Sequence, residues 1–324
     1  MPHVLVAGKL HPSGKRVLAE APDITTTFVE DAIEENYIPH VHNADAILIR
    51  TQPLRADTVA KAGRLKIVSR HGVGYDAIDV DALNARGIAL AVCGDVNATA
   101  VAEHAAMMIL AASKRALRAD ASVRRGAWEW RNGLEAQDLR DRNLLLVGFG
   151  RIGRHTASMM RGFGMRIRAF DPFLLKSGWP QDGVVPVQTL EEGLAWADVI
   201  SFSVPHTGKP LIGAGELAAM KEGVVLVNTA RGGVVDERAL VDALQSGKVA
   251  AAGIDVFEQE PVPADQPLIG FDQVILSPHI AGLTEGAAER MAIASAANIV
   301  DFFAGTIDPD LIVNKERING ERQA

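Results

Sequence analysis

The sequence predicts an α/β protein made of doubly wound parallel sheets, and three observations support this fold class. Short apolar runs rich in β-branched residues alternate with helical patterns along most of the chain, which is typical of strand–helix–strand units. The runs are apolar at successive positions, as expected for strands covered by helices on both faces. The length of 324 residues favours two domains at roughly 150 residues per domain.

The expected strands lie between turns rich in Gly or polar residues, with helices such as Ser13–Glu20 and Val80–Arg86 between them. In the first third of the chain they are Val4–Ala7, Thr26–Val29, Ala46–Ile49, Lys66–Ser69 and Ile88–Val92. The later set is Leu144–Val147, Arg166–Phe170, Val199–Ser203, Val224–Val227, Ala250–Ile254 and Val274–Leu276.

Two long Ala-rich helices are expected on either side of the second set of strands, at Asn97–Leu117 and Glu285–Phe303. The first contains no Pro or Gly and is apolar nearly all round, which indicates a buried helix. We therefore expect a discontinuous architecture. Residues 98–284 form one domain, and residues 1–97 and 285–324 together form the other.

Composition narrows the classes of function. The chain has 33 Lys and Arg against 40 Asp and Glu, a net charge of −7, whereas nucleic-acid and acidic-membrane partners need a basic footprint. The single cysteine, Cys93, excludes a disulfide framework and a cysteine-rich zinc site, and no metal is expected. Neither a signal-peptide pattern nor an apolar run near the roughly 20 residues of a membrane span is seen. We expect a cytoplasmic protein that acts on small molecules, without nucleic-acid or membrane partners.

A glycine-rich segment, Gly-Phe-Gly-Arg-Ile-Gly at 148–153, follows an expected strand and begins a helical run at Arg151–Arg161. In a dinucleotide-binding turn the glycine at Gly148 allows the tight turn, Gly150 lets the backbone approach a pyrophosphate, and Gly153 lets helix and strand pack closely. The N–H groups at the helix start attract phosphates. This combination predicts a Rossmann domain, with a purely structural turn as the alternative.

The cofactor expected in this domain is NAD rather than NADP. Asp171 lies 18 residues after Gly153, at the end of the next expected strand. A carboxylate there binds the hydroxyls of the adenosine ribose and repels a 2′-phosphate.

A second segment, Gly-Val-Gly-Tyr-Asp-Ala at 72–77, matches the same pattern. However, Asp76, Asp79 and Asp81 crowd the start of the following helix, and carboxylates there oppose a pyrophosphate. We expect a loop whose backbone N–H groups hold a smaller group such as one carboxylate, with a plain turn as an equal alternative.

Three ionisable residues come just after expected strands of the second set: Arg231, Glu260 and His279. Ligands of open α/β sheets bind outside the carboxyl ends of the strands. An Arg binds a substrate carboxylate and polarises a carbonyl, a His transfers a proton near neutral pH, and a nearby Glu favours the imidazolium. With NADH as the hydride donor, these groups suffice to convert a 2-keto acid to a 2-hydroxy acid. Each residue alone is more simply a surface or structural group.

The segments that carry these residues resemble the signatures of the NAD-dependent D-2-hydroxyacid dehydrogenase family, especially its phosphoglycerate-dehydrogenase-like branch. They are Gly148–Gly153, Asn228–Asp236, Asp255–Pro261 and Ser277–Gly282, and the resemblance extends over roughly residues 46–303. It implies an enzyme that acts on CH–OH donors, with a Rossmann nucleotide domain inserted into a flavodoxin-like substrate domain. It also implies a homodimer.

The resemblance implies a role for each matching residue. Arg231 is the substrate clamp, His279 the acid/base and Glu260 its partner. The implied cofactor-binding residues are Gly148, Gly150, Arg151, Ile152, Gly153, Asp171, Thr229, Ala230 and Asp255. The implied substrate-binding residues are Gly72, Val73 and Gly74, together with Arg231.

The substrate stays open at this point. A 2-hydroxy acid such as 3-phosphoglycerate, or a keto acid such as glyoxylate or hydroxypyruvate, fits, and Arg50, Arg70 and Arg131 are compatible with a phosphate. Two alternatives share the fold: a formate or phosphite dehydrogenase, and an NAD-sensing scaffold similar to the C-terminal-binding-protein corepressors. Formate enzymes of this family carry Gln where Glu260 stands, which counts against the first.

Overall fold

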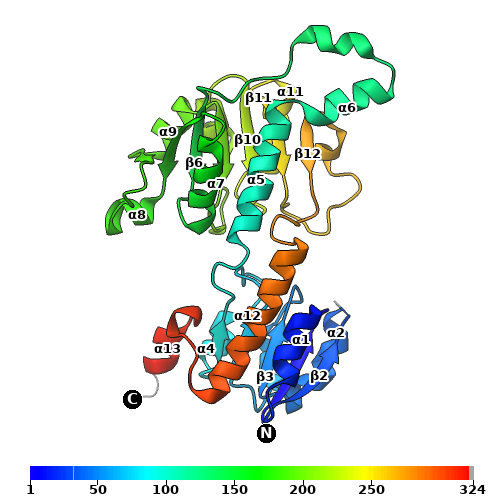
Figure 1. Ribbon diagram of the computed structural model, residues 1–324, viewed down its shortest axis with the longest axis vertical. Coiled ribbons are helices and arrows are strands. Elements are labelled where there is room, and N and C mark those ends of the chain that lie inside the picture. The colour runs from blue at the N-terminus through cyan, green and yellow to red at the C-terminus, as the bar shows by residue number, and fades with distance from the viewer. Residues whose placement is uncertain (32, 321–324) are drawn as a thin grey trace. The chain divides into compact units, whose positions relative to one another are not determined.

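The computed structural model describes residues 1–31 and 33–320 and divides the chain into two units (Figure 1). Unit 1 consists of residues 1–97 and the described residues from 284 onward, and unit 2 consists of residues 98–283. The expected cut at residues 284/285 differs from this division by one residue.

Unit 1 contains a five-stranded sheet in the order β2-β1-β3-β4-β5, with every pair of neighbouring strands parallel. Its strands are β1 (His3–Ala7), β2 (Thr25–Val29), β3 (Ala46–Ile49), β4 (Ile67–Arg70) and β5 (Ala89–Ala91). This order is that of flavodoxin-like doubly wound sheets.

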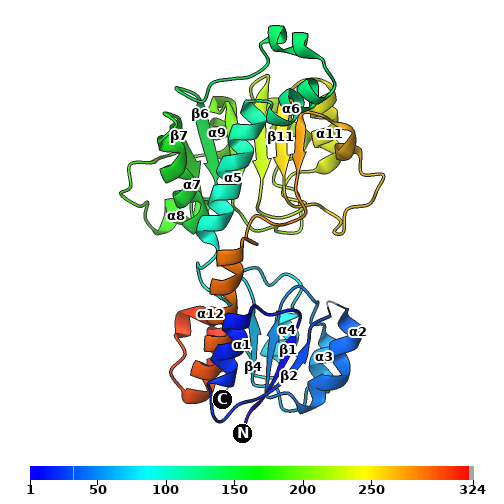
Figure 2. The same cartoon turned by 45° about the vertical axis from the view of Figure 1, so that its right-hand side comes forward.

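Helices cover both faces of the unit 1 sheet. They are α1 (Pro12–Ala19), α2 (Glu34–Tyr37), α3 (Ala56–Lys61), α4 (Val80–Asn84), α12 (Glu285–Ala304) and α13 (Lys315–Gly320). Alternate residues of β1 point to opposite sides: Leu5 packs with residues of α3 and α4, and Val4 with residues of α1 and α12. Figure 2 shows α1 and α12 together in front of this sheet. At Gly14 of α1 a Cβ would lie 2.6 Å from the Ala292 carbonyl oxygen of α12, so the missing side chain permits the close packing.

Unit 2 contains a seven-stranded parallel sheet in the order β12-β11-β10-β9-β6-β7-β8. Its strands are β6 (Asn143–Val147), β7 (Arg166–Phe170), β8 (Val185–Pro186), β9 (Val199–Phe202), β10 (Val224–Asn228), β11 (Val249–Ile254) and β12 (Val274–Leu276). Counted from β6, this is the Rossmann order 3-2-1-4-5-6 with one further strand. The order reverses between β6 and β9.

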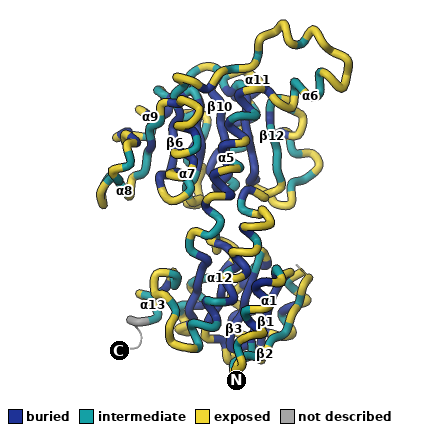
Figure 3. The backbone as a smooth tube through the Cα atoms, viewed as in Figure 1, coloured by how far each residue is buried: buried dark blue, intermediate teal, exposed yellow. Residues whose placement is uncertain are grey.

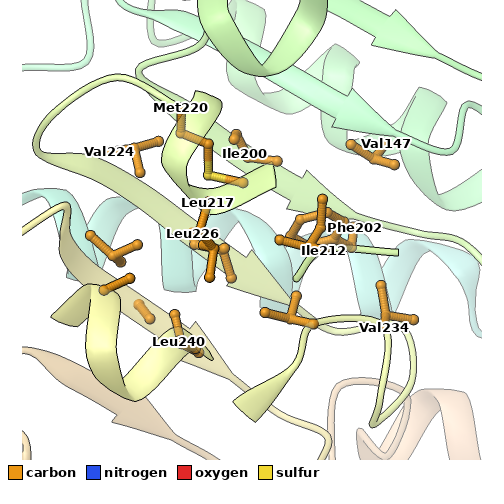
Figure 4. Close-up of a cluster of buried hydrophobic side chains, with 14 of the residues drawn as sticks. Val147, Ile200, Phe202, Ile212, Leu217, Met220, Val224, Leu226, Val234 and Leu240 are labelled. Atoms are coloured by element: carbon orange, nitrogen blue, oxygen red, sulfur yellow. The ribbon is translucent and has the colours of Figure 1, made fainter. Parts of the chain in front are cut away.

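The helices of unit 2 also cover both sheet faces. They are α5 (Ala98–Ser113), α6 (Ala116–Arg124), α7 (Arg151–Arg161), α8 (Pro172–Ser177), α9 (Leu190–Trp196), α10 (Ala214–Ala219) and α11 (Glu237–Gln245). Figure 4 shows Phe202 and Leu226 of the sheet facing Leu217 of α10 and Leu240 of α11. The opposite face packs against α5 and α7.

Capping residues explain where several helices begin. The side chains of Asp79, Thr189, Asp236 and Thr284 each accept a hydrogen bond from the backbone N–H three residues later. Such caps satisfy one of the N–H groups that have no acceptor within the helix. Asp79 thus occupies the start of α4, as expected for the second glycine-rich segment.

The two-sheet α/β prediction is confirmed, but one expected helix is wrong. The helix expected at Asn97–Leu117 ends at Ser113, and Arg115 takes a left-handed conformation with φ 54° before α6 begins. The Ser113 carbonyl accepts a hydrogen bond from the Gln137 N–H (2.9 Å), so the chain that returns toward α5 satisfies its C-terminal end. The short strand β8 was not expected.

The segment that begins with α6 forms an exposed arm of unit 2, which Figure 3 shows mostly in yellow. Neither α6 nor the following 3₁₀ turn, Trp128–Gly133, contains a buried residue. Leu117, Val123, Trp128 and Leu134 are nevertheless large apolar side chains that are 52–86% exposed. Among the described helices of both units, none is long and apolar enough to cross a membrane.

Candidate functional site

The loops after β10, β11 and β12 lie at one edge of the unit 2 sheet, because these three strands are neighbours and parallel. Glu260 lies in the loop after β11 and His279 in the loop after β12. The Glu260 carboxylate contacts the His279 ring, with 2.7 Å between Oε2 and Nδ1. The sequence could only suggest that these residues meet.

The hydrogen bonds of this pair define its chemistry. Glu260 Oε1 accepts from the Phe257 N–H (3.0 Å), which orients the carboxylate. An ionised carboxylate only accepts, so Nδ1 of His279 carries the proton that it shares with Oε2. The Nε2 atom is therefore the one left for proton exchange with a ligand. The His279 side chain is 51% exposed, so a ligand can reach it.

Asp255 holds the turn that carries His279. Its carboxylate accepts from the N–H groups of Ile280 (2.9 Å) and Ala281 (3.0 Å), and its carbonyl oxygen accepts from the His279 N–H (2.8 Å). The residue has no exposed surface, and these hydrogen bonds support the loop. The expected contact of Asp255 with cofactor stays a prediction.

Arg231 lies in the loop that follows β10. Asn228 shapes this loop, since its side chain accepts from the Ala230 N–H (3.0 Å) and donates to the Arg231 carbonyl (3.0 Å). At Gly232 a Cβ would lie only 1.8 Å from the Phe257 carbonyl oxygen. The Arg231 loop therefore packs directly against the loop that carries Glu260, and only glycine permits that contact.

The glycine-rich turn joins β6 to α7, at the point where the strand order reverses. Gly148 has φ 93°, and a Cβ there would lie 2.4 Å from the Ser203 carbonyl oxygen. A Cβ at Gly153 would lie 2.4 Å from the Gly148 carbonyl oxygen. Both glycines thus have the steric roles expected of them.

Asp171 directly follows β7 and is tied to two segments. Its Oδ2 accepts from the Phe149 N–H (3.0 Å), and its Oδ1 accepts from the N–H groups of Phe173 and Leu174 (both 3.1 Å). The same carboxylate therefore both holds the glycine-rich turn and caps the N-terminus of α8. These three N–H groups are therefore already occupied by the Asp171 carboxylate.

The residues around the turn fit a dinucleotide. A Cβ at Gly150 would meet nothing within 4 Å, and no side chain caps the N-terminus of α7, so the helix start is open to a phosphate. At the end of β10, Thr229 is 7% exposed and its hydroxyl has no hydrogen-bond partner among the described residues. An open glycine and a buried hydroxyl without a partner are features that a bound ligand can complete.

The loop expected to bind substrate follows β4 in unit 1. The Gly72 N–H already contacts the Arg70 carbonyl (2.8 Å) and Cys93 Sγ (3.3 Å), whereas Val73 is partly exposed. His71 is buried, and burial, with Arg50 and Arg70 nearby, lowers its pKa to about 4. His71 is therefore a neutral core residue of this loop.

Other sequence expectations concern metals and supporting residues. Among the described residues, no group of three or more His, Cys, Asp or Glu side chains is arranged to hold a metal ion. The supporting role of Asp255 and the contact of Gly232 with Phe257 were not expected from the sequence. Both depend on pairs of loops brought together by the strand order, and no local pattern marks them.

The chain is similar to known proteins over most of its length. The family model for the NAD-binding domain of D-isomer-specific 2-hydroxyacid dehydrogenases matches residues 106–281. A D-3-phosphoglycerate dehydrogenase of Archaeoglobus fulgidus is 41% identical over 276 residues, 84% of this chain and 52% of that protein. A glyoxylate reductase of Korarchaeum cryptofilum is 40% identical over 285 residues, 86% of this chain and 85% of that protein.

Solved structures show the same architecture. An NADPH-dependent glyoxylate/hydroxypyruvate reductase of Sinorhizobium meliloti has a TM-score of 0.81 and 31% identity, covering 94% of this chain and 95% of that one. The chain spans about half to three fifths of the D-3-phosphoglycerate dehydrogenases it matches, 52–61% of their length. The matched family model and the glyoxylate reductase show that the chain belongs to the D-isomer-specific 2-hydroxyacid dehydrogenase family.

Proposed function

We propose that this chain is an NAD-dependent oxidoreductase that interconverts a D-2-hydroxy acid and its 2-keto acid. The observation that carries the proposal is the 2.7 Å contact of Glu260 with His279. This pair lies at the carboxyl edge of the sheet whose first turn has the dinucleotide pattern. A paired imidazole at that edge is suited to proton transfer beside a hydride donor.

The cofactor would be held by the turn and the strand ends of unit 2. We assign the phosphates to the start of α7, the ribose to Asp171, and the nicotinamide half to the end of β10. These residues are Gly148, Gly150, Arg151, Ile152, Gly153, Asp171, Thr229 and Ala230. When bound, NADH supplies the hydride and NAD accepts it.

The proton is handled by His279. In the direction of reduction, its Nε2–H donates to the oxygen of the substrate carbonyl, while Glu260 stabilises the imidazolium through Nδ1. Arg231 binds the substrate carboxylate through its guanidinium and polarises the neighbouring carbonyl. In the direction of oxidation, neutral His279 accepts the proton of the hydroxyl.

Unit 1 would contribute to the recognition of the acid. We assign the backbone N–H groups of Val73 and Gly74 to substrate, with Gly72 shaping the loop through its φ of 142°. Arg50 directly follows β3, and burial lowers the pKa of its guanidinium, so binding an anion would offset a desolvated positive charge. A 2-keto acid with a second anionic group, such as the oxidation product of 3-phosphoglycerate, is therefore a substrate to test together with glyoxylate and hydroxypyruvate.

We also propose that the protein is a homodimer whose subunits meet at the exposed arm. The arm presents Leu117, Val123, Trp128 and Leu134 to solvent, and no residue of α6 is fully buried within its own chain. A second copy would cover these side chains and stabilise α6. Light scattering should give twice the 34.5 kDa mass of the chain, and Trp128→Asp with Leu134→Asp should give the monomer. A monomeric wild type would refute the proposal.

The test of the activity is oxidation of NADH with a panel of 2-keto acids that includes glyoxylate, hydroxypyruvate and a phosphorylated acid. His279→Ala should lower kcat by about 10²- to 10⁴-fold, the usual share of general acid–base catalysis. The affinity for NADH, measured by fluorescence titration, should stay within a few-fold. The exposed His40 in unit 1 provides the control variant His40→Ala.

Reduction of NAD by formate or phosphite, measured beside that panel, separates the alternatives. Turnover of formate or phosphite alone would favour the dehydrogenases of those ions. Binding of NADH without turnover of any acid would favour the NAD-sensing scaffold and would refute the proposed activity.

A further inference from the structure

We propose that His104, in the middle of α5, is a positioning residue that holds the turn of His279 in place through Ser277 and Asp255. The inference rests on the proposed function, because it concerns the geometry of the proposed acid/base. Its evidence is a chain of hydrogen bonds within unit 2.

The chain begins at a buried carboxylate. Asp255 has no exposed surface, and its Oδ1 contacts the Ser277 hydroxyl at 2.5 Å as well as the Ile280 N–H at 2.9 Å. Because an ionised carboxylate can only accept, the Ser277 hydroxyl donates its proton to Asp255.

That assignment fixes the direction of the next hydrogen bond. His104 Nε2 lies 3.0 Å from Ser277 Oγ and 3.7 Å from Asp255 Oδ1. The Ser277 proton is already engaged, so its oxygen must accept and His104 Nε2 must carry a hydrogen. His104 is thus a donor that polarises the Ser277 hydroxyl toward Asp255 and faces the buried negative charge.

The backbone of the His279 turn needs this support. His279 has φ 52°, a left-handed conformation that residues other than glycine adopt only where surrounding contacts hold them. The contacts come from Asp255, which binds the N–H groups of residues 279, 280 and 281. The hydrogen bonds from His104 to Ser277 and from Ser277 to Asp255 hold this carboxylate in place. Weakening them would let the turn relax and move the His279 ring relative to a substrate.

The packing of α5 explains why His104 reaches this point. At Gly253 a Cβ would lie 2.8 Å from Met108 Cβ, so the absence of a side chain lets α5 approach β11 closely. From Gly253 to Asp255 a strand advances about 6.6 Å, and from Met108 back to His104 a helix advances about 6 Å. These two advances are nearly equal. His104 therefore lies beside Asp255 just as Met108 lies beside Gly253.

Two substitutions of His104 distinguish a role of its hydrogen bond in supporting the His279 turn from a role of its side chain in packing alone. His104→Leu removes the donor, whereas His104→Gln retains an N–H near the position of Nε2. We expect His104→Leu to lower kcat by about 10- to 100-fold, as for a small misplacement of a catalytic group, with the KM for NADH changed less than about twofold. His104→Gln should recover most of kcat. Ile109→Val, another buried change on α5, should lower the melting temperature without lowering kcat.

Hydrogen exchange gives a readout that does not depend on turnover. The amides of Ile280 and Ala281 should exchange at least about tenfold faster in His104→Leu than in wild type, and His104→Gln should slow them again. A wild type without keto-acid reductase activity would refute the proposed function, and the exchange rates would still decide the role of His104. Unchanged exchange of these amides, equal losses of kcat in both His104 variants, or a full kcat in His104→Leu would overturn the inference.

Discussion

A buried histidine should make unit 1 lose stability as the pH falls. His71 is 6% exposed, and burial, aided by the positive charges of Arg50 and Arg70, lowers its pKa from 6.5 to about 4. The folded protein therefore resists protonation of this ring while the unfolded chain accepts a proton. Stability is full above pH 6.5 and is lost as the pH falls from 6.5 toward 4.

The size of the effect follows from the two pKa values. Between pH 7.5 and pH 5.0 the loss of unfolding free energy from His71 should be about 2 kcal/mol. Between pH 7.5 and pH 4 it should reach about 3 kcal/mol. His71→Gln cannot take up this proton and should lose correspondingly less stability over the same interval. Because each variant is compared with itself at two pH values, any constant loss from the substitution cancels.

The assay is equilibrium urea unfolding followed by far-UV circular dichroism at pH 7.5 and 5.0. The urea midpoint should shift less between the two pH values in His71→Gln than in the wild type. His40→Gln, which removes an exposed histidine of the same unit, should keep the pH dependence of the wild type. The reasoning fails if His71→Gln loses as much stability as the wild type between the two pH values.

Three further outcomes follow from contacts described above. Asp171→Ser removes a charge that repels a 2′-phosphate and should raise kcat/KM for NADPH relative to NADH by about tenfold or more; an unchanged ratio in steady-state assays would contradict the assignment. Gly232→Ala forces a Cβ against the Phe257 carbonyl and should lower kcat about 10- to 100-fold, while Gly215→Ala, where a Cβ meets nothing within 4 Å, should not. Burial raises the pKa of the Cys93 thiol to about 11, so Ellman's reagent at pH 8 should label it rapidly in urea and hardly at all in the folded protein; rapid labelling without urea would show the burial to be wrong.

The periodic parts of the fold were predictable from local sequence. Strands such as Ala46–Ile49 and Val274–Leu276 were expected with the bounds that the structure has, because buried parallel strands are short apolar runs between turn residues. The end of α5 could not be predicted, because no Gly or Pro stands at Arg115. The helix stops where residue Gln137, distant in sequence, takes the Ser113 carbonyl.

The candidate site was predictable as a set of residues and not as a geometry. Strand ends identified Arg231, Glu260 and His279, but the contact between Glu260 and His279 follows from the neighbouring positions of β11 and β12. Asp255 illustrates the same limit. The family resemblance implied a contact with cofactor, whereas the hydrogen bonds of its buried carboxylate to the His279 turn could not be read from the sequence.

The insertion of one unit into the other also sets an order of events during synthesis. The β1–β5 sheet is complete by residue 91, but Ala292, Ala296 and Ile299 of α12, which pack on Val4, Val6 and Leu48, come only after the 186 residues of unit 2. At about 5–20 residues per second, the ribosome needs roughly 10–40 s to make that insert. During this interval α12 does not yet exist, so the part of the sheet face that it later covers has no helix on it. That apolar surface is then exposed to chaperones and to other nascent chains.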